Sequence, residues 1–294
     1  ALDPDLRVIE LFSHPTPRRL AARLRELARG CEAPQRLLHR LTPQPPPGVA
    51  ERFAFVCFPH GGGDAIAYQP LAAALPPGVA LWAVSPPGHD PTNPGPMLPV
   101  SELAERAAEE IARTVRRPFA VYGHCAGVVA ALETARVLEE TGHRADLLYL
   151  AAALPEDDPE HSLELERLST DEDLVAHLRS MDGFDGVLDE RDLAAVLRMV
   201  RHDMTEAARF FARTPDGYPT PLTTPLICLI GDADPATEGY AEAHLGWGRY
   251  ARDVDLAVLP GARHYFAKHL PDQLAALLTS THRTDQHAME DNDE

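Results

Sequence analysis

Cysteine is scarce in this sequence, and the four cysteines that are present stand far apart. Cys31, Cys57, Cys125 and Cys228 include no C-x-x-C pair and no spacing typical of zinc ligands. The sequence therefore predicts neither a disulfide framework nor a metal site. Cys57 and Cys228 lie inside apolar runs that are typical of strands, so we expect both to be core residues.

Positive charge and long apolar runs are also lacking. The 294 residues include 27 basic and 45 acidic side chains, and the resulting net charge of −18 does not favour nucleic acid or an anionic membrane as a partner. No apolar run approaches the roughly 20 residues that span a bilayer, and residue 1 does not begin a charged-then-apolar signal. Because 45% of the residues are hydrophobic, the chain can bury a large core, and we expect a soluble, cytoplasmic protein.

What the sequence does contain, from residue 53 onward, is an alternation of short apolar runs with segments of helical periodicity. This alternation predicts an α/β fold with a mostly parallel, doubly wound sheet covered by helices on both faces. The predicted strands cover residues 53–59, 80–85, 118–123, 146–152, 224–230 and 254–260. The predicted helices lie near residues 65–75, 101–116, 126–141, 236–250 and 268–279. Right-handed crossovers would bring the loops after the strands to one edge of the sheet, where such folds place their sites.

The third predicted strand runs directly into Gly-His-Cys-Ala-Gly at residues 123–127, and an Ala/Val/Leu-rich helix follows. G-x-C-x-G between a strand and a helix is typical of a nucleophile elbow, in which the glycines allow a tight turn that lifts the central side chain out of the sheet. At the start of a helix, Cys125 would meet unpaired N–H groups and the positive end of the helix dipole, both of which lower the pKa of a thiol. The alternative is a small buried cysteine in a glycine-rich turn.

A second glycine-rich stretch, His-Gly-Gly-Gly at residues 60–63, follows the first predicted strand. Consecutive glycines let the backbone pass close to a ligand, and α/β-hydrolases place half of their oxyanion hole at this position. We assign the N–H of Gly61 to that role and the N–H of Ala126 to the other half. An ordinary glycine-rich turn is the alternative. A phosphate-binding loop is disfavoured because G-x-x-x-x-G-K-[ST] is absent.

An acid and a histidine follow the last two predicted strands. Gly-Asp-Ala-Asp-Pro at residues 231–235 comes after the fifth strand, and Ala-Arg-His-Tyr-Phe around His264 comes after the sixth. Alone, the acid would be an ordinary helix cap and the histidine a surface residue. With the elbow they complete the order nucleophile, acid, base. The sequence therefore predicts a triad of Cys125, Asp234 and His264, with Asp232 as the alternative acid.

Three other segments flank this core. Residues 1–30 contain Leu-Phe-Ser-His-Pro-Thr and then Leu-Ala-Ala-Arg-Leu, which resembles the last two helices of an acyl or peptidyl carrier domain. That resemblance implies a remnant that carries no substrate, because the Asp-Ser attachment site is absent; the alternative is an arbitrary amphipathic hairpin. Residues 31–51 end in a proline-rich run and predict a semi-stiff linker. Residues 281–294 are polar and acidic, and they predict a disordered tail.

The two glycine-rich loops, Pro-Pro-Gly-His at residues 86–89, and the motifs around Asp234 and His264 together resemble the thioesterases of nonribosomal peptide and polyketide synthases. The motifs occur in the family's order, and the resemblance covers residues 52–280. It implies an α/β-hydrolase fold with a helical lid at residues 155–223. Apolar residues at helical spacing predict two amphipathic helices within this lid, near residues 171–181 and 189–212. We expect this lid to be mobile and to shape the acyl pocket, although packing on the domain would also explain its apolar stripes.

The same resemblance implies a partner and a substrate. An upstream peptidyl or acyl carrier domain would bring the acyl or peptidyl thioester on its phosphopantetheine arm to a monomeric domain. No bound metal or redox cofactor is implied. Within the matching motifs, the residues expected to contact the substrate are His60, Gly62, His124 and Tyr265.

Two features depart from the family pattern. The acid follows the later strand, as in discrete proofreading thioesterases, whereas most terminal thioesterases place it after the strand that follows the elbow, where residues 151–154 here read Ala-Ala-Ala-Leu. The second departure is cysteine where serine is usual. Because an acyl group held on a thiol stays activated, we expect release by intramolecular cyclisation to a small lactam or lactone. The alternatives are hydrolytic release or proofreading, and a non-catalytic domain that docks carriers.

Overall fold

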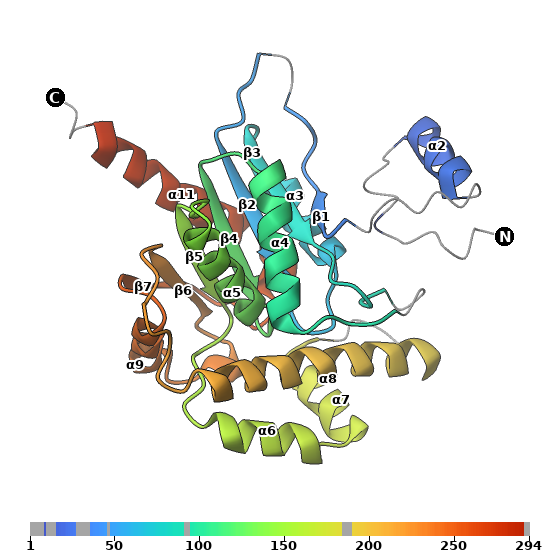
Figure 1. Cartoon of the computed structure of the whole chain (residues 1–294), viewed down its shortest axis with the longest axis vertical. Coiled ribbons are helices and arrows are strands. Elements are labelled where there is room, and N and C mark those ends of the chain that lie inside the picture. Colours follow the sequence, from blue (N-terminus) through green and yellow to red (C-terminus); the bar gives the residue numbers. More distant parts are fainter. Residues whose placement is uncertain are drawn as a thin grey trace.

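The computed structural model describes residues 9, 16–27, 36–45, 48–90, 95–183 and 190–290. Within these residues, the chain forms a seven-stranded sheet with the order β1-β3-β2-β4-β5-β6-β7 (Figure 1). Strands β2 to β7 pair in parallel, and β1 pairs antiparallel with β3. The strands are β1 (Leu38–Arg40), β2 (Phe53–Phe58), β3 (Val79–Val84), β4 (Phe119–His124), β5 (Leu147–Ala151), β6 (Leu226–Gly231) and β7 (Val254–Leu259).

The central strands are apolar along their whole length because both faces of the sheet are covered. Every residue of β2, β4, β5 and β6 is buried, as expected for parallel strands between two helical layers. Helices α4 (Val100–Thr114) and α5 (Gly127–Glu140) cover one face. On the other lie α3 (Gln69–Ala74), α10 (Phe266–His269) and α11 (Pro271–Glu290). The predicted doubly wound α/β fold is confirmed, and each predicted strand is present.

Strand β1 lies inside the segment that the sequence predicted as a linker, residues 31–51. Leu38 stands opposite Val84 in the antiparallel pair, and Arg40 stands opposite Trp82. The strand has three residues, which is too short for a period of two to be visible in the sequence. The linker prediction is therefore corrected, because the sheet already begins at Leu38.

One predicted helix, residues 236–250, is broken into shorter pieces. The structure instead has a 3₁₀ turn η2 (Pro235–Thr237), a short helix α9 (Tyr240–Ala243) and a second 3₁₀ segment η3 (His244–Arg249). Gly239 adopts a φ of +78° between the first two pieces, and this left-handed conformation interrupts a continuous helix.

The two ends of the chain are only partly described. Helix α2 (Pro17–Leu27) forms where the second helix of the carrier-like pattern was expected. Of the first one only Ile9 falls within the described residues. Helix α11 continues to Glu290, into the segment 281–294 that was predicted as a disordered tail, because no glycine or proline follows Pro271 to end it. None of the described helices is both long and apolar enough to cross a bilayer.

Three helices between β5 and β6 form a layer that we call the lid: α6 (Pro159–Leu168), α7 (Asp171–Ser180) and α8 (Glu190–Arg213). They lie together along one side of the domain (Figure 1). Helices α7 and α8 were predicted at residues 171–181 and 189–212. Helix α6 was not predicted, because it buries none of its side chains and so shows no apolar stripe.

The apolar stripes of α7 and α8 pack against one another and against the core. Leu174 and Leu178 of α7 form one buried cluster with Leu197 and Val200 of α8, and Tyr265 from the loop after β7 belongs to the same cluster. The lid therefore rests on the residue next to His264.

Candidate active site

Cys125 stands at a sharp turn between β4 and α5. Its φ of +53° lies in the left-handed region, which non-glycine residues rarely adopt. Two glycines make the close packing of this turn possible. A Cβ on Gly127 would lie 2.1 Å from the carbonyl oxygen of Pro59, and one on Gly123 would lie 2.7 Å from the carbonyl oxygen of Gly127. The N–H of Cys125 donates to the carbonyl of Ala151 at 2.9 Å, which fixes the turn to the neighbouring strand.

His264 and Asp234 meet at the same edge of the sheet as Cys125. Nδ1 of His264 donates to Oδ2 of Asp234 at 2.8 Å, and both side chains are buried. The other oxygen of Asp234 accepts from the N–H of Ala236 at 2.9 Å, which orients the carboxylate. Asp232, the alternative acid, instead accepts from the N–H of Gly261 at 2.6 Å. Asp234 is therefore the acid that contacts the histidine.

The second ring nitrogen of His264 is directed to Cys125. Nε2 is buried and makes no well-formed hydrogen bond with a described nitrogen or oxygen. It lies close enough to the thiol for each group to change the pKa of the other. A histidine held at Nδ1 with Nε2 beside a thiol is the arrangement in which an imidazole takes or keeps the thiol proton.

The pKa values of this pair favour a thiolate and an imidazolium. Burial acts against both charges, but the charge of His264 and its hydrogen bond outweigh burial and lower the pKa of the Cys125 thiol. Burial likewise opposes the charge on His264, yet the thiolate of Cys125 and the hydrogen bond to Asp234 raise its pKa to about 10. The lowered pKa of the thiol and the raised pKa of the imidazole both favour a negative charge on Cys125 and a positive charge on His264.

Two backbone N–H groups complete the surroundings of the sulfur. The amides of Ala126 and Gly61 both hydrogen-bond Sγ of Cys125 and help to lower its pKa. Ala126 lies at the start of α5 and Gly61 in the loop after β2, which are the two segments predicted to form the oxyanion hole. Two N–H donors at one sulfur can also reach an oxygen that develops on a carbon bonded to that sulfur.

The remaining cysteines differ sharply from Cys125. Cys57 and Cys228 are buried, as predicted for core residues. Burial raises the pKa of Cys57 well above its ordinary value and that of Cys228 to about 12. Cys31 lies outside the described residues. Of the described thiols, Cys125 is therefore the one whose surroundings favour the thiolate.

His60 and Tyr265, both predicted to contact substrate, lie beside this centre. Nδ1 of His60 donates to the carbonyl of Gly61 at 3.1 Å. The rings of His60 and Tyr265 meet edge to face with their centroids 5.0 Å apart. Tyr265 also contacts His264 with a centroid separation of 5.0 Å. The two side chains thus connect the loop after β2 with the loop that carries His264.

His124 and Gly62 are placed differently from the prediction that they contact substrate. His124 is 2% exposed, accepts from the hydroxyl of Tyr122 through Nδ1 at 3.0 Å and donates from Nε2 to the carbonyl of His264 at 2.8 Å. Burial, followed by the nearby charge of His264, lowers its pKa well below the ordinary value, so the ring is neutral. His124 therefore supports the backbone of His264 and has no free polar atom for a substrate. Gly62 faces the lid, where its N–H donates to Asp203 at 2.8 Å.

Asp203 on α8 is the residue near the centre that sequence reasoning missed. It also contacts His89, from the Pro-Pro-Gly-His motif after β3, with Nε2 at 2.8 Å from Oδ2. Asp203 stands more than a hundred positions from both Gly62 and His89 in the sequence, and no sequence motif links it to either of them. Only the shared Pro-Pro-Gly-His motif pointed to this region.

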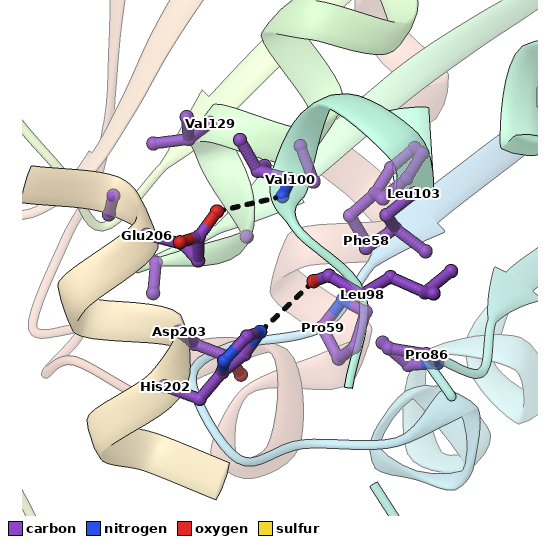
Figure 2. A pocket seen from close by; sticks show the side chains of 14 residues that line it. Phe58, Pro59, Pro86, Leu98, Val100, Leu103, Val129, His202, Asp203 and Glu206 are labelled. Carbon is purple, nitrogen blue, oxygen red and sulfur yellow. Dashed lines mark hydrogen bonds between the residues drawn. The ribbon is translucent and has the colours of Figure 1, made fainter. Parts of the chain in front are cut away.

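Other contacts of α8 with the core are visible in Figure 2. Glu206 accepts from the N–H of Val100 at 3.0 Å, and Nε2 of His202 donates to the carbonyl of Leu98 at 3.0 Å. A cavity of about 40 Å³ lies between these contacts and the start of α5, with Ala126 and Asp203 among its lining residues. These two hydrogen bonds hold helix α8 against the core, beside the cavity that Ala126 of the nucleophile elbow lines.

Comparison with known proteins decides the family. The family model described as "Thioesterase domain" matches residues 54–289, which is most of the chain. The chain belongs to this thioesterase family. Its curated relatives include "Thioesterase PikA5" of Streptomyces venezuelae, 35% identical over 202 residues that make up 65% of this chain and 67% of the relative. The "Probable cadicidin biosynthesis thioesterase" of Streptomyces griseus is 29% identical over 229 residues, or 76% of this chain, but the match spans only 61% of that relative's length.

Solved thioesterase structures share the fold of this chain. The structure of the type II thioesterase BorB from the borrelidin biosynthetic cluster superposes with a TM-score of 0.66. It is 26% identical, and the match covers 83% of this chain and 96% of that one. The predicted α/β-hydrolase fold is confirmed. In this thioesterase the position after β5, where a terminal enzyme of the family was expected to place its acid, holds Ala152 with a φ of +54°.

Proposed function

We propose that this thioesterase releases the product of a nonribosomal peptide or hybrid polyketide synthase through an acyl-enzyme intermediate on Cys125. His264 is the base and Asp234 orients it, while Gly61 and Ala126 supply the oxyanion hole. The observation that carries the proposal is the hydrogen bond of 2.8 Å between His264 Nδ1 and Asp234, on a histidine that lowers the pKa of Cys125. That arrangement favours the nucleophilic thiolate over the neutral thiol.

The acylation step follows from this geometry. The thiolate of Cys125 attacks the carbonyl carbon of an acyl group that a carrier domain presents on its phosphopantetheine arm, forming a carbon–sulfur bond. The carbonyl oxygen becomes an oxyanion that accepts from the N–H groups of Gly61 and Ala126. As the oxyanion collapses, the bond to the pantetheine sulfur breaks, and that sulfur takes the proton from Nε2 of His264. The acyl group is then held on Cys125 as a thioester.

Cysteine in place of serine favours cyclisation. Exchange of one thioester for another is nearly thermoneutral, so the acyl group keeps its activation, whereas transfer to a serine would form a more stable ester. A retained thioester reacts readily with an amine or hydroxyl of its own chain, which loses its proton to His264. Closure breaks the bond to Sγ and regenerates the Cys125 thiolate, with a small lactam or lactone as the product.

The partner in this proposal is an upstream acyl or peptidyl carrier domain. The lid lies over the edge of the sheet where the triad sits, and α7 and α8 rest on Tyr265. Access for a pantetheine arm therefore requires either a passage beside α8 or movement of the lid. The carrier itself supplies the phosphopantetheine, and the thioesterase contributes the nucleophile, the base and the two amide donors.

A second candidate, hydrolytic release or proofreading, is favoured by the place of the acid. Asp234 follows β6, whereas the position after β5 is occupied by Ala152. This is the arrangement expected for discrete proofreading enzymes, and BorB is described as a type II thioesterase. In that case water would attack the acyl-Cys125 thioester. A domain that only docks carriers is disfavoured, because such a domain would not need an imidazolium beside a thiol.

The substitution Cys125→Ser separates cyclisation from hydrolysis. With an acyl-pantetheine thioester whose chain carries an internal amine, we expect the ratio of ring to free acid to fall about tenfold in the serine variant, because an ester intermediate is less reactive toward the amine. The products are measured by liquid chromatography and mass spectrometry. If the variant makes as much ring as the unchanged enzyme and no more acid, the explanation of the cysteine is wrong. Free acid alone from the unchanged enzyme would favour the hydrolytic candidate.

A further inference from the structure

Asp203 of the lid joins three segments at one carboxylate. Its Oδ2 accepts from the N–H of Gly62, in the loop after β2, at 2.8 Å. Nε2 of His89, in the loop after β3, lies 3.0 Å from Oδ1 and 2.8 Å from Oδ2. Asp203 of helix α8 thus contacts both the loop after β2 and the loop after β3.

The charge of His89 follows from its partners. Nε2 faces the Asp203 carboxylate, and Nδ1 faces the carbonyl of Pro87 at 3.1 Å. Both partners are acceptors, so both ring nitrogens carry protons and the ring is an imidazolium. Burial opposes this charge, but the hydrogen bond and charge of Asp203, with a smaller contribution from Asp64, raise the pKa of His89. The ring of His202 on α8 also faces His89, with centroids 6.5 Å apart.

The hydrogen bond to Gly62 fixes the peptide that follows the oxyanion donor. The carbonyl of the Gly61–Gly62 peptide accepts from His60 at 3.1 Å, and its N–H donates to Asp203, so the peptide is held on both sides. The neighbouring N–H, that of Gly61, donates to Sγ of Cys125. Consecutive glycines have wide conformational freedom, and their backbone orientation must come from such external contacts.

The lid also fits this loop sterically. Gly62 has a φ of +72°, and a Cβ there would lie 2.6 Å from Cγ2 of Val200 on α8. Helix α8 therefore packs closely on Gly62 through Val200 and also places Asp203 within hydrogen-bond distance of the Gly62 N–H.

We propose that Asp203, with His89 as its charge partner, is a positioning residue that orients the Gly61 N–H toward the reacting carbonyl oxygen. The acyl-transfer site is then complete only while α8 lies on the loop. This inference rests on the proposed function, because it assigns Asp203 to the oxyanion hole of acyl transfer to Cys125. It makes the lid part of the catalytic geometry as well as a cover.

Two reactions of Cys125 distinguish this role from a structural one. Acyl transfer from an acyl-pantetheine thioester develops an oxyanion, whereas alkylation by iodoacetamide takes place at a saturated carbon and develops none at the attacked atom. In Asp203→Ala we expect kcat for pantetheine release to fall about 10- to 100-fold with KM within about threefold. The alkylation rate of Cys125, measured at a pH high enough to ionise the thiol fully in both proteins, should stay within about twofold. Asp203→Asn keeps an oxygen that can accept from Gly62 and should recover acyl transfer to within about fivefold.

Glu206→Ala is the matched control. It removes another acidic side chain of α8 that accepts from a backbone N–H of the core, at Val100, far from the glycine loop in sequence. If the contact of α8 with the core is what matters, Glu206→Ala will lose as much acyl transfer as Asp203→Ala, and the inference is overturned. Equal slowing of alkylation and acyl transfer in Asp203→Ala would overturn it too. Absence of any acyl adduct on Cys125 in the unchanged enzyme would instead overturn the proposed function, and this inference with it.

Discussion

Replacing His264 with alanine is expected to lower acyl transfer from an acyl-pantetheine thioester about 10³- to 10⁴-fold, because the imidazole both ionises Cys125 and protonates the leaving sulfur. The same substitution should change the pH dependence of Cys125 alkylation. In the unchanged enzyme the pKa of Cys125 is lowered, so its thiolate remains at pH values at which an ordinary thiol is already protonated. In His264→Ala, burial still raises the pKa of the thiol, but the charge and hydrogen bond that lower it are lost. The pKa of Cys125 therefore rises.

Alkylation at about pH 7 should therefore slow at least tenfold in His264→Ala and recover as the pH is raised, since each pKa unit changes the thiolate fraction tenfold. Mass spectrometry of the modified peptides measures this rate. His143→Ala is the matched control, because the His143 side chain is exposed and its ring contacts the nearby carbonyl of Thr141. Unchanged alkylation at neutral pH in His264→Ala would show that the histidine does not activate Cys125.

Replacing Gly127 with alanine is expected to lower the free energy of unfolding by about 3 kcal/mol or more. The new Cβ would lie 2.1 Å from the carbonyl oxygen of Pro59 and 2.9 Å from that of Phe58. These backbone atoms lie at the end of β2 and at the start of the loop that leads to the oxyanion glycines, so relief of the overlap must move either α5 or this segment. Urea unfolding measures the loss of stability, and the acylation rate of Cys125 should fall with it.

Gly248→Ala controls for the loss of a glycine as such. Gly248 is exposed in η3, with no atom within 4 Å of the position of its Cβ. We expect its free energy of unfolding to change by no more than about 0.5 kcal/mol. A Gly127→Ala enzyme as stable as the Gly248→Ala enzyme would contradict the close packing of the elbow.

The strands and the elbow were predictable because their signals are local. Each central strand is a continuous apolar run between turn residues, and G-x-C-x-G carries the steric requirement of the turn in its own glycines. Strand β1 and helix α6 were missed for the opposite reason. The first has three residues, and the second buries no side chain, so neither has a periodic pattern.

The choice between two acids shows where local patterns end. Asp232 and Asp234 both follow β6, and the sequence favoured Asp234 without excluding its neighbour. In the folded chain Asp234 contacts His264, whereas Asp232 accepts from the N–H of Gly261 in the loop after β7. The distinction depends on how that loop returns to the sheet edge, which no spacing within residues 231–235 encodes.

Substrate contacts were the least predictable part of the site. His124 stands next to Cys125 in sequence, yet the alternation of side chains along β4 turns it away into the core, where Tyr122 and the His264 carbonyl occupy both of its nitrogens. The N–H of Gly62 donates to Asp203 of the lid. Residues beside a nucleophile in sequence can therefore support the centre instead of facing the substrate.

The most direct test of the central claim is the intact mass of the enzyme after mixing with acyl-pantetheine thioesters of several chain lengths, beside Cys125→Ala. Covalent catalysis predicts an added acyl mass that maps to Cys125, is absent from the alanine variant and decays with formation of a ring or a free acid. An adduct on another residue, or turnover that survives in Cys125→Ala, would contradict the account.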